Sequence, residues 1–293
     1  MNSFPSLEGL KVVVDSGNGT AGVVAPEIIR RLGAEVIELF SEPDGTFPNH
    51  HPDPVVPENM KTMINSVLNN KAHLGIGFDG DGDRLGVVDE HGEMIWGDNL
   101  MIIFARDILR KYPGAKIIGE VKCSDVMYRE IKKMGGVPIM WKTGHSLIKR
   151  KMKEEGALLA GEMSGHMFFM DRYFDYDDAI YASLRLLEII KNYGKPYSIN
   201  KLLQDIQFMY ATPEIRIECP EDQKEEVIKK AKKCFKSYSC CLIDGVRVSF
   251  EKGWALIRPS NTQPVLVVRF EAETEADLEE IKNFFKEKLG LEI

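Results

Sequence analysis

Long hydrophobic runs are missing from this sequence of 293 residues. No apolar segment approaches the roughly 20 residues that a helix needs to cross a bilayer, so we expect no membrane span. Residues 1–9 hold no basic stretch followed by an apolar one, and we therefore expect no signal peptide and a cytoplasmic location. Positive charge is not in excess, because the net charge is −7. A negative net charge argues against a nucleic-acid partner.

Cysteine is also scarce. The five cysteines show neither the spacing of a metal site nor that of a disulfide framework, and reduced thiols are the simplest interpretation. Hydrophobic residues make up 44% and charged residues 28% of the chain, which is typical of a soluble globular protein. The length is enough for two or three domains.

The order of predicted strands and helices divides the chain into three parts. In residues 1–95, an apolar run at 10–14, a helix to residue 32 and a strand at 34–39 indicate a parallel sheet with a crossover helix. Residues 96–206 repeat an α/β order. Residues 207–293 change to a strand at 212–218, a charged helix, three successive strands and a final helix, which predicts an antiparallel sheet covered by helices.

Two features of the first part invite a ligand but favour a structural interpretation. The glycine-rich turn at 16–22 lacks the G-x-G-x-x-G spacing of a nucleotide site, so we interpret it as a tight connection between a strand and a helix. His50 and His51 are adjacent, which is a poor geometry for metal ligands, and we expect a surface loop there.

The most informative stretch is the Asp-Gly-Asp-Gly-Asp-Arg motif at residues 79–84, between two apolar strand-like segments. At ~4 Å separation and an effective dielectric of ~20, each pair of carboxylates repels by about 4 kcal/mol. Hard divalent cations such as Mg²⁺ take oxygen ligands and would relieve this repulsion. The glycines let the backbone bend until Asp79, Asp81 and Asp83 converge, and Arg84 would face a phosphate.

Two other interpretations of this motif remain open. The spacing of Asp79, Asp81, Asp83 and Glu90 fits a calcium loop of the EF-hand type, but Arg84 stands where that loop needs glycine and the flanks predict strands. The other interpretation is a solvated hairpin turn with no binding or catalytic role, since Asp-Gly is a common turn pair. We favour a metal site for phosphoryl transfer.

Three further groups of residues suit a phosphorylated sugar. Residues 258–264 offer a guanidinium, hydroxyls, an amide and turn N–H groups, which suit a phosphate dianion, although an ordinary hairpin loop is equally compatible. Glu162, Ser164 and His166 alternate, so an extended loop would present them on one side to sugar hydroxyls; a polar turn is the alternative. Lys122 and His145 each follow a predicted strand, where ligands of α/β sheets gather; the alternative for each is a solvated side chain or one satisfied within the core.

These motifs, taken together along the whole chain, resemble the α-D-phosphohexomutases, and most closely the bacterial phosphomannomutase/phosphoglucomutase group. The resemblance implies a fold class of two successive mixed α/β sheet domains (1–95 and 96–206) and an α+β C-terminal domain like the TATA-box-binding protein (207–293). It also implies roles for the motif residues. The metal ligands would be Asp79, Asp81 and Asp83; the catalytic residues Arg84, Lys122 and His145; and the substrate contacts Glu162, Ser164, His166, Arg258, Ser260, Asn261, Thr262 and Arg269.

The same resemblance implies an isomerase that moves a phosphoryl group between the 1- and 6-positions of glucose or mannose phosphates. Mg²⁺ would be the cofactor, hexose 1,6-bisphosphate the intermediate and activator, and the protein a monomer. The family's nucleophile is a phosphoserine in a T-A-S-H-N-P-like segment of its first domain, and no such segment occurs here. We therefore expect the chain to resemble domains two to four and to be inactive alone. The alternatives are a sugar-phosphate-binding regulator and a metal-dependent phosphatase that uses an aspartate.

Overall fold

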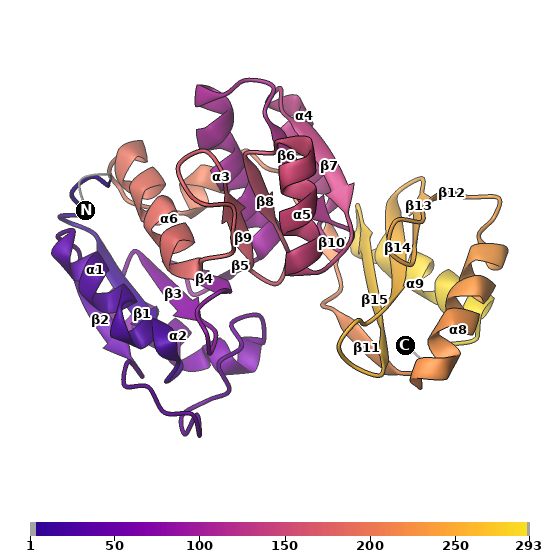
Figure 1. Cartoon of the computed structure of the whole chain (residues 1–293), viewed down its shortest axis with the longest axis horizontal. Helices are drawn as coiled ribbons and strands as arrows, with labels where there is room; N and C mark the ends of the chain where they lie inside the picture. Colours follow the sequence, from indigo (N-terminus) through magenta and orange to yellow (C-terminus); the bar gives the residue numbers. More distant parts are fainter. Residues whose placement is uncertain (1–3, 292–293) are drawn as a thin grey trace. The chain divides into compact units, whose positions relative to one another are not determined.

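A computed structural model describes residues 4–291 of the chain (Figure 1). Two compact units can be distinguished, and each is described by itself. The first takes in the described residues up to Gly119, together with residues 127–139 and 144–206. The second consists of residues 120–126 and 140–143 with the C-terminal part from Gln207 onward.

The first sheet of the first unit carries the acidic loop at the end of a central strand. Its strands follow the order β2-β1-β3-β4-β5 and comprise β1 (Lys11–Asp15), β2 (Glu35–Leu39), β3 (Leu74–Phe78), β4 (Leu85–Asp89) and β5 (Met94–Ile95). Strand β1 is parallel to β2 and β3, whereas β3 and β4 form an antiparallel hairpin. The acidic loop is the turn of this hairpin.

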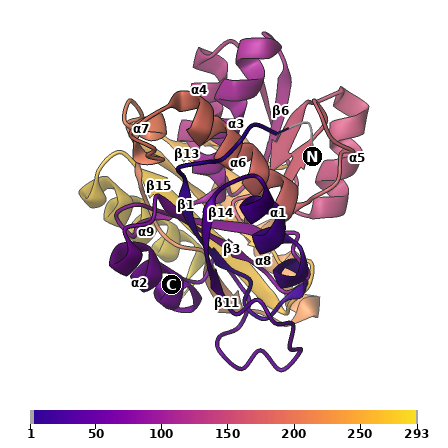
Figure 2. The ribbon, with the colours of Figure 1, turned by 90° about the vertical axis from the view of Figure 1, so that its left-hand side faces the viewer.

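A helix lies close to strand β3 of this sheet (Figure 2), and glycine in the strand leaves room for it. The helix is α2 (Pro57–Asn70), whose buried residues Met60, Met63 and Val67 lie against β1, β3 and β4. A Cβ atom at Gly75 would stand 2.9 Å from side-chain atoms of both Met63 and Val67. The glycine-rich turn forms a short 3₁₀ helix, η1 (Thr20–Val23), followed by α1 (Ala25–Arg31), as the strand-to-helix interpretation predicts.

The second sheet has the order β7-β6-β8-β9, with β8 parallel to β6 and antiparallel to β9. Helices α3 and α5 pack against β8. The strands are β6 (Lys116–Glu120), β7 (Val137–Trp141), β8 (Leu159–Gly161) and β9 (Met167–Phe169). The helices of this region are α3 (Gly97–Lys111), α4 (Asp125–Lys133), α5 (His145–Glu155), α6 (Ala179–Tyr193) and α7 (Asn200–Leu203).

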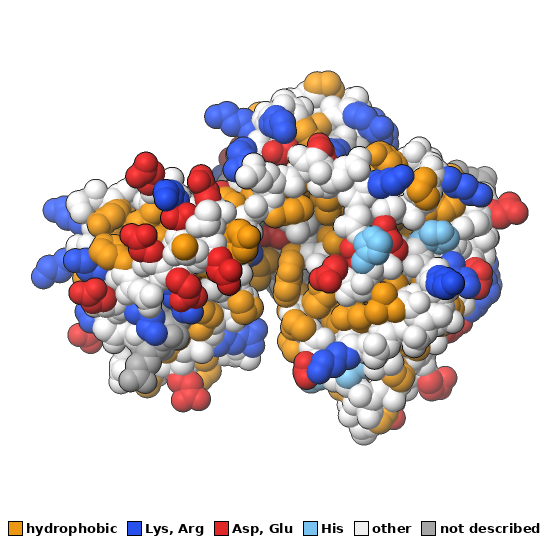
Figure 3. All heavy atoms as spheres, turned by 180° about the vertical axis from the view of Figure 1, so that it is seen from behind, with side chains coloured by type: hydrophobic (Ala, Val, Ile, Leu, Met, Phe, Trp, Pro, Cys, Tyr) orange, Lys and Arg blue, Asp and Glu red, His pale blue; other side chains and the backbone are white. Residues whose placement is uncertain are grey.

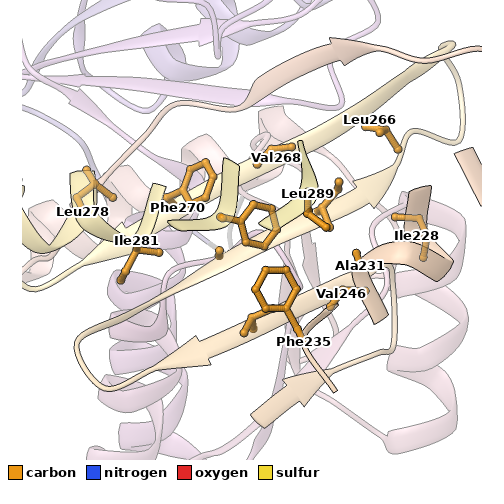
Figure 4. Packing of buried hydrophobic residues seen from close by; sticks show 14 of the residues in the cluster. Ile228, Ala231, Phe235, Val246, Leu266, Val268, Phe270, Leu278, Ile281 and Leu289 are labelled. Carbon is orange, nitrogen blue, oxygen red and sulfur yellow. The ribbon is translucent and has the colours of Figure 1, made fainter. Parts of the chain in front are cut away.

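The C-terminal sheet of the second unit is antiparallel, in the order β10-β15-β14-β13-β12, and β11 also pairs with β15. Helices α8 and α9 pack on it around the stacked rings of Phe235 and Phe285, whose centroids are 5.0 Å apart. Figure 4 shows part of this core, including Phe235 and Phe270. The strands are β10 (Tyr210–Ala211), β11 (Ile215–Glu218), β12 (Ser239–Cys241), β13 (Val246–Phe250), β14 (Gly253–Pro259) and β15 (Val265–Ala272). The helices are α8 (Glu221–Cys234) and α9 (Glu275–Leu289).

Strand β14 is buried on both faces because its side chains alternate. Ala255 and Ile257 belong to the core beneath the helices, while Trp254 and Leu256 cluster with Val121 of the same unit. The guanidinium of Arg247 lies 3.7 Å from the centroid of the Trp254 ring and donates to the carbonyls of Val121 and Cys123. Residues 120–126 are therefore part of this unit's packing.

The predicted fold class, two mixed α/β sheets followed by an α+β region, is confirmed. The short strands β5, β10 and β12 were not predicted, because two or three residues carry too little pattern to be recognised. Among the described residues, no helix combines the length and apolarity that crossing a bilayer requires. On the face that Figure 3 shows, basic and acidic side chains are interspersed.

Candidate functional site

The acidic loop is organised around the buried carboxylate of Asp79. Its Oδ1 accepts hydrogen bonds from the backbone N–H groups of Gly82, Asp83 and Arg84, at 3.1, 3.0 and 3.0 Å. Its Oδ2 accepts from Arg84 Nε at 2.7 Å. The Asp79 side chain thus fixes the path of the whole turn. Strands β3 and β4, which the turn connects, hold its two ends.

Arg84 compensates the negative charge of this loop. Besides Asp79 it contacts Asp53, with 2.9 Å between Arg84 Nη1 and Asp53 Oδ1. Burial raises the pKa of Asp79, and this effect outweighs the opposite effect of Arg84. Asp53 was not recognised from the sequence, because it lies far along the chain in a loop without a motif.

The three carboxylates of the motif fit a divalent cation. Asp79, Asp81 and Asp83 each bring one oxygen to within 4.8 Å of the others. A carboxylate oxygen that accepts one hydrogen bond retains a second lone pair, so Asp79 can both shape the loop and bind a metal. An all-oxygen set with several carboxylates is the chemistry that Mg²⁺ and Ca²⁺ prefer.

The glycine-rich turn supports the acidic loop from the side. Thr20 donates its backbone N–H to the Gly80 carbonyl at 3.0 Å. A Cβ atom on Gly19 would stand 2.8 Å from the Gly80 oxygen and 2.9 Å from the Asp79 oxygen. His50, expected in a surface loop, lies 3.2 Å from Asp15 at the end of β1, which raises its pKa through the hydrogen bond to that carboxylate.

The loop at residues 161–166 lies directly against the acidic loop within the first unit. Leu85 donates its backbone N–H to the Gly165 carbonyl at 3.1 Å, and Arg84 and His166 form an isolated antiparallel bridge. A side chain at Gly165 would collide with the backbone of Leu85, because its Cβ atom would stand 2.5 Å from the Leu85 oxygen. The structure therefore brings together two segments that the sequence analysis treated as separate sites.

His166 is held between carboxylates on both of its ring nitrogens. Its Nδ1 lies 3.0 Å from Glu162 Oε2 and its Nε2 lies 3.4 Å from Asp83 Oδ2. Burial alone would lower the pKa of His166, but the hydrogen bonds and charges of Asp83 and Glu162 raise it to about 10. The same pairing lowers the pKa of Asp83 against the opposing effect of burial.

Glu162 and Ser164 share the side of the loop that carries His166. The Ser164 hydroxyl lies 3.1 Å from both Glu162 Oε2 and His166 Nδ1. Glu162 also accepts the backbone N–H of Gly144 at 2.6 Å, at the start of α5. The predicted grouping of carboxylate, hydroxyl and imidazole is present, tied into one hydrogen-bonded network.

His145 opens α5 beside the same network. Its ring centroid lies 5.7 Å from that of His166, and its Nδ1 lies 3.1 Å from Asp177 Oδ2. Asp177 was not identified from the sequence. It lies just before α6, and neither a motif nor its spacing distinguishes it from the acidic residues around it.

The loop at residues 258–264 in the second unit is held by Lys224 of α8 and by the hydroxyl of its own Ser260. Lys224 donates to the carbonyls of Ser260 and Gln263, at 2.9 and 2.7 Å, and the Ser260 hydroxyl accepts the N–H groups of Thr262 and Gln263 at 3.3 and 3.2 Å. Asn261 Nδ2 lies 3.4 Å from the Thr143 carbonyl.

Arg258 stands at the base of this loop and is almost fully buried. Its Nε donates to Asp244 Oδ2 at 2.9 Å, and Asp244 also accepts the backbone N–H of Thr143. The Nη2 atom is buried without a hydrogen-bond partner in the described part of the chain. A buried, unsatisfied guanidinium nitrogen is unfavourable unless an acceptor reaches it.

Lys122 and Arg269 are engaged by groups within the second unit. Lys122 Nζ lies 3.0 Å from Glu214 and 3.6 Å from Glu120. The Arg269 guanidinium donates to the Lys122 carbonyl and, at 3.5 Å, to the Thr212 carbonyl. These contacts position both cations, and their predicted roles toward a ligand stay predictions.

Three models of one protein family match the chain in succession. They are described as phosphoglucomutase/phosphomannomutase, alpha/beta/alpha domain II, over residues 3–92; alpha/beta/alpha domain III, over 96–207; and the C-terminal domain, over 214–288. The matches follow the order of the two α/β regions and the α+β region.

Relatives extend this result. A phosphomannomutase/phosphoglucomutase of Pseudomonas aeruginosa is 51% identical over 284 residues, which are 96% of this chain and 60% of the relative. A phosphomannomutase of Methanocaldococcus jannaschii is 35% identical over 277 residues, 93% of this chain and 61% of the relative. This chain spans about 60% of the length of these curated relatives.

Solved structures show the same fold. A crystal structure of a phosphoglucomutase/phosphomannomutase family protein from Burkholderia thailandensis has a TM-score of 0.90 and 44% identity, covering 98% of this chain and 62% of that one. An N-acetylphosphoglucosamine mutase of Aspergillus fumigatus, in complex with GlcNAc-6P and magnesium, has a TM-score of 0.69 and 14% identity, covering 97% and 67%. At that identity the second likeness concerns the fold alone.

Proposed function

Because this chain belongs to the phosphoglucomutase/phosphomannomutase family, we propose that it supplies the metal loop, the sugar loop and the phosphate loop of a phosphohexomutase. The reaction moves a phosphoryl group between the 1- and 6-positions of glucose or mannose phosphate through a hexose 1,6-bisphosphate. The observation that carries this proposal is the junction of the acidic loop with residues 161–166, where Asp83 and His166 are 3.4 Å apart.

The acidic loop would hold Mg²⁺ through Asp79, Asp81 and Asp83. When bound, the ion stabilises negative charge on the transferring phosphoryl group. Arg84 uses Nε and Nη1 in its contacts with Asp79 and Asp53, so its Nη2 can donate to a phosphate oxygen. The magnesium in the Aspergillus complex is consistent with this choice of metal.

The remaining residues would bind and orient the sugar phosphate. Glu162 and Ser164 would contact the sugar hydroxyls, with His166 and His145 beside them at the first unit's site. In the second unit, Arg258 Nη2, Asn261 and Thr262 would donate to the phosphate, and Ser260 shapes the loop that presents them. We assign Lys122 to the reacting end and Arg269 to the phosphate end of the substrate.

We further propose that the phosphoryl donor is a phosphoserine on a separate domain. In the first transfer, the P–O bond to serine breaks as a P–O bond to a sugar hydroxyl forms, and the hydroxyl proton ends on the serine oxygen. The reverse transfer from the other position of the reoriented bisphosphate regenerates phosphoserine. Among the 293 residues no T-A-S-H-N-P-like segment could supply this group, so the isolated chain would bind its ligands without turnover.

Calorimetric titration of glucose 1,6-bisphosphate, with and without Mg²⁺, tests the ligand-binding part of this proposal. We expect Mg²⁺ to strengthen binding in the unaltered chain and to have no such effect in Asp81→Ala. Binding that is equally strong without Mg²⁺ and in the variant would contradict it. A phosphate-release assay on the same samples distinguishes the phosphatase alternative, for which Mg²⁺-dependent hydrolysis would be the result.

A further inference from the structure

A second group of ligand-bearing side chains adjoins the acidic loop and differs from it in chemistry. Asp83, His145, His166 and Asp177 each offer one ligand atom, and all four atoms lie within 4.8 Å of one another. Carboxylate oxygens alone suit Mg²⁺, whereas imidazole nitrogens suit zinc and its neighbours among the transition metals. We propose that these four residues form a Zn²⁺ site, separate from the Mg²⁺ position in the acidic loop.

The distances between ligand atoms match a tetrahedral ion. Bonds of about 2.0–2.2 Å from zinc to nitrogen and oxygen place neighbouring ligand atoms about 3.3 Å apart. His145 Nδ1 and Asp177 Oδ2 are separated by 3.1 Å, and His166 Nε2 and Asp83 Oδ2 by 3.4 Å. His166 Nε2 and Asp177 Oδ2 are 4.0 Å apart, and all four ligand atoms lie within 4.8 Å of one another, so closure around an ion requires pairs to approach by up to about 1.5 Å.

The orientation of His166 is that of a metal-binding imidazole. Metal-ligating histidines generally give their other ring N–H to a carboxylate, which fixes the ring and its tautomer. Here Glu162 Oε2 lies 3.0 Å from Nδ1 and leaves Nε2 turned toward Asp83 and Asp177. Glu162 is itself held by the backbone N–H of Gly144. Binding of the ion would replace the proton on Nε2.

The site is accessible and is built from four separate segments. Asp83 comes from the β3–β4 turn, His145 from the start of α5, His166 from the residue before β9 and Asp177 from the loop before α6. The His145 side chain is 59% exposed, so an ion can reach the group from solvent without unfolding.

Sharing of Asp83 couples the two ions. A zinc ion bound through Asp83 takes a ligand from the acidic loop and adds positive charge beside it, so Mg²⁺ and Zn²⁺ weaken each other's binding to the same degree. If the proposed function is correct, Zn²⁺ would also occupy residues that face the sugar phosphate and would inhibit turnover. The binding proposal itself does not depend on that function.

Cobalt is the probe for the experiment, because Co²⁺ in a tetrahedral site absorbs visible light much more strongly than Co²⁺ surrounded by six oxygen ligands. We titrate the full chain with Co²⁺, displace it with Zn²⁺, and repeat both with His145→Asn, Asp177→Asn and Glu162→Gln. We expect intense Co²⁺ absorption that Zn²⁺ removes. The affinity for Co²⁺ should be at least about tenfold lower in His145→Asn and in Asp177→Asn, and about 10–100-fold lower in Glu162→Gln.

Two variants serve as controls. His91→Gln removes an exposed histidine outside the group and should leave Co²⁺ binding unchanged, and Asp81→Asn should weaken Mg²⁺ but retain the intense Co²⁺ absorption. His145 is exposed, so its substitution should leave the fold intact, which circular dichroism checks. If His145→Asn folds and binds Co²⁺ as the unaltered chain does, or if Asp81→Asn alone abolishes the absorption, the proposal is wrong. No hexose phosphate is present, so this result is separate from the test of the proposed function.

Discussion

The acidic loop of the first unit and the loop at residues 258–264 of the second unit solve opposite electrostatic problems. The first gathers carboxylates that repel one another, and Arg84 and His166 compensate only part of that charge. The second contains the buried guanidinium of Arg258, which pairs with Asp244 and whose Nη2 has no hydrogen-bond partner among residues 4–291. A cation would stabilise the first loop and an anion the second.

The way each loop is supported differs as well. Asp79 is at once a candidate ligand and the acceptor that shapes its loop, so ligand binding and local stability depend on one side chain. In the second loop, Lys224 holds the backbone carbonyls of Ser260 and Gln263, while the proposed phosphate contact is a different residue, Arg258. Substitutions should therefore affect stability and affinity together in the first loop and more separately in the second.

The largest effect is expected for Asp79→Ala. This change leaves three backbone N–H groups and Arg84 Nε without their acceptor, and we expect a loss of about 3 kcal/mol in the free energy of unfolding, together with loss of Mg²⁺ binding. Urea denaturation without metal and calorimetry with Mg²⁺ measure the two effects. Asp81→Ala is the matched control. Because Asp81 is exposed, this variant should lose Mg²⁺ binding but keep the stability of the unaltered chain. If Asp79→Ala and Asp81→Ala lower the free energy of unfolding equally, Asp79 does not have the loop-shaping role described above.

Gly19→Ala tests whether the glycine-rich turn positions the acidic loop. The backbone at Gly19, with φ of −87°, suits any residue, but the added methyl group would meet the backbone oxygens of Gly80 and Asp79. We expect destabilisation of about 1–3 kcal/mol and weaker Mg²⁺ binding, measured as above. A Cβ on Gly45 meets nothing within 4 Å, so Gly45→Ala should change neither quantity. If Gly19→Ala and Gly45→Ala have the same stability and the same Mg²⁺ affinity, the glycine-rich turn does not position the acidic loop.

Arg258→Ala should weaken anion binding, and circular dichroism must show that the variant is folded, because the change also leaves the Asp244 carboxylate without its partner. Loss of a charge-assisted hydrogen bond should weaken binding of glucose 6-phosphate by at least about tenfold. Lys252→Ala removes an equal charge from an exposed position of the same sheet and should leave the affinity unchanged. If NMR titration finds the same affinity in both variants, the loop at 258–264 does not bind the phosphate.

The smallest effect is expected for Lys224→Met. The long apolar side chain is retained, but the two carbonyls that Lys224 holds in the 258–264 loop lose their donor. We expect a few-fold loss in glucose 6-phosphate affinity, corresponding to about 1 kcal/mol. Lys229→Met, at an exposed position of the same helix, should have no effect. A loss as large as that of Arg258→Ala would mean that Lys224 itself contacts the ligand.

Sequence patterns predicted what is local and missed what depends on the tertiary fold. The acidic motif and the alternating residues 162–166 can each be recognised within a few residues of sequence, and the family that the motifs resemble is confirmed by three matching domain models. Asp53, Asp177 and Asp244 could not be found this way, because no motif or spacing distinguishes these loop residues from the other acidic residues of the chain. Their partners become adjacent only when distant segments pack.

We propose that these 293 residues carry the ligand sites of a phosphohexomutase and that a phosphoserine domain outside them supplies the phosphoryl group. A coupled assay of glucose 1-phosphate conversion to glucose 6-phosphate, with Mg²⁺, glucose 1,6-bisphosphate and protein free of host mutase, tests it directly. We predict no turnover by the chain alone and turnover after addition of the family's phosphorylated N-terminal domain as a separate polypeptide. Robust Mg²⁺-dependent turnover by the isolated chain, abolished by Asp81→Ala, would contradict the account.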